Sequence, residues 1–141
     1  MSKKGPILLI EDDEDDQLMI SQVIQSLDIS NPIQVFYNGK EALDHLEKTQ
    51  EQPFLILCDV NMPVLNGLEL RHLISQSEYL RRKCIPFVFL TTTASPEAVR
   101  EAYNDSVQGF YQKANTYAGF QEQIKLIIAY WESCLHPNYL L

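Results

Sequence analysis

The sequence predicts an α/β fold in which helices cover both faces of a parallel β-sheet. Short apolar segments alternate with longer segments of helical periodicity along nearly the whole chain of 141 residues. Three of the short segments, residues 6–10, 54–58 and 87–91, are apolar almost throughout, as expected for strands buried on both faces of a parallel sheet. Five strand–helix units in strict alternation favour a doubly wound sandwich.

Five strands and five helices account for this pattern. The expected strands are residues 6–10, 33–37, 54–58, 87–91 and 109–113. The expected helices are residues 14–28, 39–50, 67–82 and 95–105, and a last helix whose apolar face runs from Phe120 to Leu135. Asn38-Gly39 and Asn66-Gly67 are turn signals before the second and third helices, and Ser95-Pro96 is a typical helix start.

The composition restricts the classes of partner and compartment. The net charge of −8 argues against a nucleic-acid surface, because phosphate binding needs a basic patch. The three cysteines have no CxxC spacing and the N-terminus has no signal-peptide pattern, so we expect a reduced, cytoplasmic protein without a membrane span. We expect one domain over residues 1–141, with its core at about 5–136 and a short tail at 137–141.

Polar side chains follow the expected strands at their carboxyl ends, where ligands bind in sheets of this kind. Glu11 and Asp12 follow the first strand, and Asp59 follows the third. Thr91 ends the fourth strand and Lys113 the fifth. Three clustered carboxylates ionise together only at high cost without a cation, and a small set of hard oxygen ligands suits Mg²⁺. The set therefore indicates a site for a phosphoryl group, with one carboxylate as the nucleophile.

The acidic run "EDDEDD" at residues 11–16 divides into two parts on this interpretation. Glu11 and Asp12 lie at the strand end and are expected to hold Mg²⁺ with Asp59. The acids at positions 13–16 lie at the start of the first helix, where negative charge interacts favourably with the helix dipole.

Four motifs resemble the response-regulator receiver domains of two-component signalling. They are "LLIEDD" (8–13), "LILCDVNMPVLNG" (55–67), "FVFLTT" (87–92) and "GFYQK" (109–113), and the resemblance covers nearly the whole chain. It implies a flavodoxin-like (βα)5 sandwich with a five-stranded parallel sheet in the order 2-1-3-4-5.

The resemblance also implies roles for the residues at the strand ends. Asp59 matches the phosphoacceptor, and Glu11 and Asp12 match the acidic pair that binds Mg²⁺ with it. The backbone carbonyl of Asn61 is expected to be a further metal ligand.

Three further residues match the part of the family's site that responds to phosphorylation. Thr91 is expected to donate its hydroxyl to the phosphoryl group, and Lys113 to pair with that group and with Asp59. Phe110 occupies the place of the family's switch aromatic. Gly67, in the turn after the phosphoacceptor, is expected to supply backbone freedom.

The sequence departs from the family pattern after Lys113, where Ala114 replaces the usual proline. We expect a trans peptide bond there, because a cis bond before a residue other than proline costs about 3–4 kcal/mol. The histidines, at positions 45, 72 and 136, have no nucleophile–base spacing, and we expect them at the surface.

The implied partners are a histidine kinase or a histidine phosphotransfer protein, and a downstream protein target. In this family, the face formed by the fourth helix, fifth strand and fifth helix often carries dimerisation or partner binding. In this chain that face includes residues near Tyr103, Phe110 and Tyr111.

Two alternatives remain open from the sequence. A pseudo-receiver would keep the fold and bind partners without phosphorylation, as the Lys113-Ala114 step would allow. A Mg²⁺-dependent hydrolase would act through an aspartyl-phosphate, but such enzymes usually carry a second acid two residues after the nucleophile, where this chain has Asn61.

Overall fold

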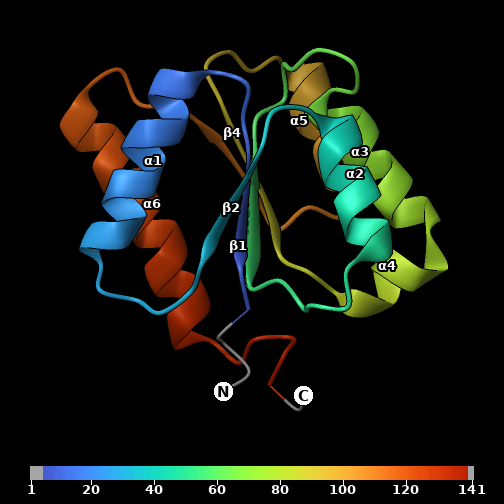
Figure 1. Ribbon diagram of the computed structural model, residues 1–141. Helices are drawn as coiled ribbons and strands as arrows, with labels where there is room; N and C mark the ends of the chain where they lie inside the picture. Colours follow the sequence, from blue (N-terminus) through green and yellow to red (C-terminus); the bar gives the residue numbers. More distant parts are fainter. Residues whose placement is uncertain (1–4, 140–141) are drawn as a thin grey trace.

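In the computed structural model, the described residues 5–139 fold as five parallel strands covered by six helices (Figure 1). The basic start of the chain at residues 1–4 and the end of the expected tail at 140–141 lie outside the described residues. The strands are β1 (Ile7–Ile10), β2 (Ile33–Phe36), β3 (Leu55–Cys58), β4 (Phe87–Thr91) and β5 (Gly109–Gln112). The helices are α1 (Glu14–Ser26), α2 (Gly39–Lys48), α3 (Gly67–Gln76), α4 (Glu78–Lys83), α5 (Pro96–Asn104) and α6 (Tyr117–Ser133).

The strands confirm the order expected from the sequence, β2-β1-β3-β4-β5. All pairs are parallel, and Ile10 lies in register with Phe36 on one side and with Cys58 on the other. Helices α1 and α6 cover one face of the sheet, while α2 to α5 cover the other (Figure 1). The carboxyl ends of all five strands therefore meet at one edge.

Alternating residues of the central strands supply the two cores. Leu8 and Ile10 of β1 belong to the core under α2 to α5, whereas Ile7 and Leu9 belong to the core under α1 and α6. All four are at most 1% exposed. A shift of β1 by one residue would exchange these faces, so two-sided burial fixes the position of the residues that follow the strand.

The segment expected as one helix at residues 67–82 forms two helices, α3 and α4, so the expectation of five helices is wrong by one. Ser77 is the cause, because its extended backbone (ψ 117°) ends α3 and its hydroxyl accepts a hydrogen bond from the Leu80 N–H to cap α4. A serine side chain competes in this way with the helical hydrogen bonds of its own segment. The other sequence signals for helix starts are confirmed, with N-caps at Asn38, Asn66 and Ser95.

Gly67 is required for its lack of a side chain and not for backbone freedom, which corrects the sequence interpretation. No glycine among the described residues has a positive φ, and the left-handed position in this turn is Val64 (φ 69°). Gly67 begins α3 against the end of β3, and its N–H donates to the carbonyl of Val60 at 2.8 Å. A Cβ at Gly67 would overlap the carbonyl oxygen of Asp59 and lie 2.8 Å from Cε1 of Phe89.

The residues after α6 fold back onto the start of β3. His136 is 2% exposed and stacks on Phe54 with ring centroids 4.8 Å apart, so the expectation of surface histidines is wrong for this one. Its Nδ1 accepts from the backbone N–H of Asn138, whose side-chain amide donates to the carbonyls of Gln52 and Pro53. Sequence spacing gave no signal for this contact. Among the described residues, none of the helices has the length and apolar composition needed to cross a membrane.

We predict that Gly67→Ala lowers the free energy of unfolding by about 2 kcal/mol or more, because the added methyl group meets backbone atoms that have no room to move. Urea denaturation followed by circular dichroism measures this change. Gly109→Ala is the matched control, since its Cβ would meet only side-chain atoms at 3.6 Å or more. Equal effects of the two substitutions would contradict this account of Gly67.

Candidate functional site

The carboxyl ends of β1, β3, β4 and β5 surround a cleft of about 220 Å³. The chain brings together here every strand-end residue that the sequence singled out, together with Asp13, Asp16 and Thr92. The lining residues are Glu11, Asp12, Asp13, Asp16, Asp59, Asn61, Thr91, Thr92 and Lys113. The backbone holds this rim rigidly, because the Asp59 N–H donates to the Ile10 carbonyl and the Lys113 N–H donates to the Thr91 carbonyl.

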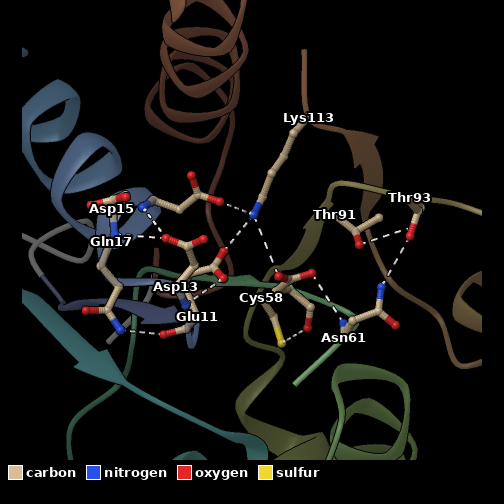
Figure 2. Close-up of polar contacts among 11 residues, drawn as sticks. Glu11, Asp13, Asp15, Gln17, Cys58, Asn61, Thr91, Thr93 and Lys113 are labelled. Atoms are coloured by element: carbon tan, nitrogen blue, oxygen red, sulfur yellow. Dashed lines mark hydrogen bonds and ion pairs between the residues drawn. The ribbon is translucent and has the colours of Figure 1, made fainter. Parts of the chain in front are cut away.

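Lys113 lies at the centre of the charged groups (Figure 2). Its ammonium donates to Oε1 of Glu11 at 2.8 Å and to Oδ2 of Asp16 at 2.7 Å. Oδ2 of Asp59 lies 3.6 Å from the ammonium, within ion-pair range but beyond a hydrogen bond. The Lys113 side chain is 7% exposed, so these interactions are only weakly screened by water.

The pKa values reflect this crowding. Burial raises the pKa of Glu11, the charge of Asp59 raises it further and Lys113 opposes the rise, which leaves the pKa at about 8. Burial by itself lowers the pKa of Lys113. Its hydrogen bonds to Asp16 and Glu11 and the charge of Asp59 outweigh burial, so the pKa lies above its ordinary value. The site thus holds more negative charge than one ammonium compensates.

A cation fits this charge imbalance. Glu11, Asp12 and Asp59 each offer a carboxylate oxygen, and these oxygens lie within 4.8 Å of one another. Glu11 and Asp59 are buried, whereas Asp12 is exposed at the mouth of the cleft. The cluster could therefore bind a metal, and all of its donors are hard oxygens of the kind that Mg²⁺ and Mn²⁺ prefer.

Asp13 acts as the N-cap of α1, accepting hydrogen bonds from the N–H groups of Asp15 and Asp16. Its position agrees with the helix-start role expected for this part of the acidic run. Gln17 donates its side-chain amide to the Glu11 carbonyl, so the first turn of α1 also ties down the strand end that carries Glu11 (Figure 2).

Thr91 and Asn61 converge on Thr93 on the opposite side of the cleft from α1 (Figure 2). The fully buried Thr91 donates its hydroxyl to the Thr93 carbonyl at 3.2 Å. The Asn61 amide reaches the Thr93 hydroxyl at 3.5 Å, and the Asn61 N–H donates to Oδ1 of Asp59 at 3.3 Å. The loop after β4 is thereby connected to Asp59 through side chains.

Phe110 is half-buried on β5, and its ring lies 5.4 Å from that of Phe89. It packs against the core under α2 to α5 and does not line the cleft. The described residues contain no cis peptide bond, so the trans bond expected between Lys113 and Ala114 is confirmed.

Asp16 is the site residue that the sequence interpretation missed. It was grouped with the acids that interact with the helix dipole, yet its carboxylate holds Lys113. Side chains in a first helical turn lean towards the helix N-terminus, and here that end of α1 faces the cleft. The sequence shows the helix start but not the distance to β5, which comes from the last part of the chain.

Comparisons with known proteins show the family to which the chain belongs. A family model of the response regulator receiver domain matches residues 7–125, and the chain therefore belongs to this family. Receiver domains are parts of the response regulators of two-component signalling. They pair with histidine kinases and downstream targets, and they are signalling proteins, not conventional enzymes.

Individual relatives cover most of the chain. "Probable methanogenesis regulatory protein FilR2" of Methanothrix harundinacea is 31% identical over 129 residues, which is 89% of this chain and 82% of the relative. Response regulator Rcp1 of Synechocystis is 28% identical over 130 residues, 89% of this chain and 87% of Rcp1.

Solved structures show the same fold. The phosphorylated cyanobacterial phytochrome response regulator RcpA superposes with a TM-score of 0.87 at 26% identity, over 95% of this chain and 98% of RcpA. The Mn²⁺-bound form of Rcp1 superposes with a TM-score of 0.83 at 27% identity, over 92% of this chain and 95% of Rcp1.

Proposed function

We propose that this protein is a phosphoacceptor response regulator that receives a phosphoryl group on Asp59 from a histidine kinase or a histidine phosphotransfer protein. The observation that carries the proposal is the placement of the Asp59 carboxylate. It lines the cleft together with the acids that follow β1, and the ammonium of Lys113 lies 3.6 Å from it. This placement also favours a phosphate-dependent regulator over a pseudo-receiver, because the Ala114 substitution leaves Lys113 at the site.

Mg²⁺ is the proposed metal, held by Glu11, Asp12 and Asp59. The three carboxylates offer oxygens within 4.8 Å of one another, and the backbone carbonyl of Asn61 is proposed as a fourth ligand. When bound, the ion would compensate negative charge that develops on the phosphoryl oxygens. The similar Rcp1 has been solved in a Mn²⁺-bound form, which supports the binding of a divalent metal by this protein.

In the proposed transfer, a bond forms between an oxygen of Asp59 and phosphorus while the bond from phosphorus to the donor imidazole nitrogen breaks. The electron pair of the broken bond stays on that nitrogen, and the donor leaves as a neutral imidazole because its other ring nitrogen carries a proton. Lys113 neutralises charge on the phosphoryl oxygens, and Thr91 exchanges its hydrogen bond to the Thr93 carbonyl for one to the phosphoryl group. Hydrolysis of the acyl phosphate later restores Asp59.

We further propose that output passes through protein–protein contact at the face formed by α5, β5 and α6. Helices α5 and α6 are the fourth and fifth helices expected from the sequence, because the expected third helix forms α3 and α4. Movement of Thr91 towards the phosphoryl group would shift the loop after β4, and with it α5 and the aromatic Phe110. Tyr103 on this face is 51% exposed, which suits an interface residue. The protein would act in the cytoplasm, where its kinase is expected to deliver the phosphoryl group.

We predict that Mg²⁺ raises the melting temperature by about 5–10 °C at a hundredfold excess over its Kd, because only the folded chain gathers the three carboxylates. Since the folded-state pKa of Glu11 is about 8, metal binding at pH 6 must displace a proton, and the apparent Kd should be larger at pH 6 than at pH 8. Differential scanning fluorimetry with EDTA or Mg²⁺ at both pH values measures the two effects.

Asp12→Asn should lose most of this response to Mg²⁺, whereas Asp15→Asn, which removes the same charge outside the carboxylate group, should retain it. A melting temperature that stays constant across a Mg²⁺ titration to high millimolar concentration would exclude the proposed metal site.

We predict that incubation with acetyl phosphate and Mg²⁺ adds the mass of one phosphoryl group to the wild-type chain. Intact-mass spectrometry detects the product, and EDTA should prevent its formation. Asp59→Asn should show no mass gain, because an amide oxygen is a much weaker nucleophile than a carboxylate. A wild-type chain that remains unmodified while a known response regulator in the same buffer is phosphorylated would point to the pseudo-receiver alternative.

We predict that Tyr103→Ala weakens the phosphorylation-dependent contacts of the protein by about tenfold in Kd, as expected for loss of an interface aromatic. Sedimentation velocity after treatment with acetyl phosphate and Mg²⁺ measures self-association, and titration calorimetry measures binding to the downstream protein. Tyr37→Ala is the control, since Tyr37 is similarly exposed (47%) but follows β2 at the other edge of the sheet. The proposed face is wrong if Tyr103→Ala leaves both contacts intact.

A further inference from the structure

Lys113 is bound by two carboxylates, and neither of them is the proposed phosphoacceptor. Its ammonium has three N–H groups, of which one donates to Glu11 and one to Asp16 at 2.7–2.8 Å. Asp59 is farther away, at 3.6 Å. The ammonium is thus held nearer to α1 than to the carboxylate that it is expected to assist (Figure 2).

Asp16 is placed for this contact by the start of α1. Its N–H donates to the capping Asp13 at 3.1 Å, which fixes the backbone of the first turn beside the cleft. The Asp16 side chain is 24% exposed and the Lys113 side chain 7%, so their ion pair is largely shielded from solvent. Asp16 and Lys113 also line a second hollow beside α6, so the pair lies between two cavities.

Asp16 differs from Glu11 in its relation to the proposed metal. Glu11 belongs to the carboxylate group that could hold a cation, and Asp16 does not. A cation would attract the carboxylate of Glu11 and so weaken its bond to Lys113, whereas Asp16 would keep its full charge for the ammonium. In the metal-bound protein, Asp16 would then be the main competitor of Asp59 and its phosphoryl group for Lys113.

We propose that Asp16 is a positioning residue that restrains Lys113 away from Asp59 and thereby slows phosphoryl transfer onto Asp59. The inference rests on the proposed function and adds a specific control of its rate. A charge-assisted bond to Asp16 both occupies one donor of the ammonium and cancels part of its charge. The N–H donor and the full positive charge are both needed in the transition state, where negative charge spreads over the phosphoryl oxygens.

The test compares rates of phosphorylation by acetyl phosphate at saturating Mg²⁺ in the wild type, Asp16→Asn and Asp16→Ala. We expect the rate constant to rise about threefold in both variants, the size of effect that corresponds to one partly exposed ion pair. Asp16→Glu should return the rate towards the wild-type value, because a longer carboxylate still reaches the flexible lysine. Circular dichroism melting curves report whether each variant folds.

Asp15→Asn is the matched control for charge alone. Asp15 is the neighbouring acid in the same helical turn, and it does not line the cleft. A less negative cleft attracts an anionic donor more strongly, so a purely long-range charge effect would accelerate Asp15→Asn as well. Acceleration of the Asp16 variants but not of Asp15→Asn supports the proposal, whereas equal acceleration overturns it. Slower phosphorylation of Asp16→Asn also overturns it, because Asp16 would then orient Lys113 productively.

A crystal structure of Asp16→Asn tests the restraint without any phosphorylation. We expect the distance between the Lys113 ammonium and the Asp59 carboxylate to shorten from 3.6 Å to hydrogen-bond range. An unchanged distance would overturn the proposal even if Asp59 is phosphorylated. Conversely, a wild-type chain that gains no phosphate would contradict the proposed function, while the distance would still report on the restraint.

Discussion

Two buried carboxylates, those of Glu11 and Asp59, lie at the ends of adjacent strands. The ammonium of Lys113 forms ion pairs with both of them and with Asp16 of α1. Burial raises the pKa of Glu11, and the neighbouring charge of Asp59 raises it further, so keeping both carboxylates charged in this cleft is costly. The rest of the structure has to hold them there. Only a rigid frame keeps such groups together, because a flexible one would relax by moving them apart.

The parallel sheet supplies that rigidity. Two-sided burial fixes the register of β1 and β3, and hydrogen bonds along the strand ends continue to Asp59 and Lys113. Gly67 allows α3 to begin directly against the Asp59 backbone, where any side chain would overlap it. On the other side, the first turn of α1 holds the Glu11 strand end through Gln17 and contacts Lys113 through Asp16. Stability of the core and chemistry of the cleft thus depend on the same backbone positions.

The unequal distances around Lys113 give the site a physical basis for control. Hydrogen bonds to Glu11 and Asp16 hold the Lys113 ammonium 3.6 Å from the Asp59 carboxylate. This distance exceeds hydrogen-bond range by less than an ångström. A small displacement of the ammonium is enough to change its partners. Thr91 is in a similar position, since its hydroxyl donates to the Thr93 carbonyl and would have to exchange that bond in the proposed contact with a phosphoryl group. Under the proposed function, both residues would therefore have two alternative partners, which is the property a two-state switch requires.

Local patterns in the sequence were enough to predict the strands, their parallel arrangement and the five residues at the strand ends, while the order of the strands followed from the resemblance to receiver domains. Apolar runs and helix-start signals depend on neighbouring residues only, and the topology rule for such sheets then places the carboxyl ends together. The same reasoning failed where a competing local bond decided the outcome, as at Ser77, which divides the expected third helix.

Contacts between distant parts of the chain were decided by the tertiary structure alone. His136 is buried because Phe54, 82 residues earlier, offers its ring and carbonyl. Gly67 is needed because α3 packs on Asp59, and the expected reason, backbone freedom, does not apply. Asp16 is part of the site because α1 lies beside the end of β5, which brings Asp16 into contact with Lys113, 97 residues later in the sequence. The sequence by itself determined which groups stand at the strand ends, while packing decided which of them touch, because distances between elements depend on the whole core.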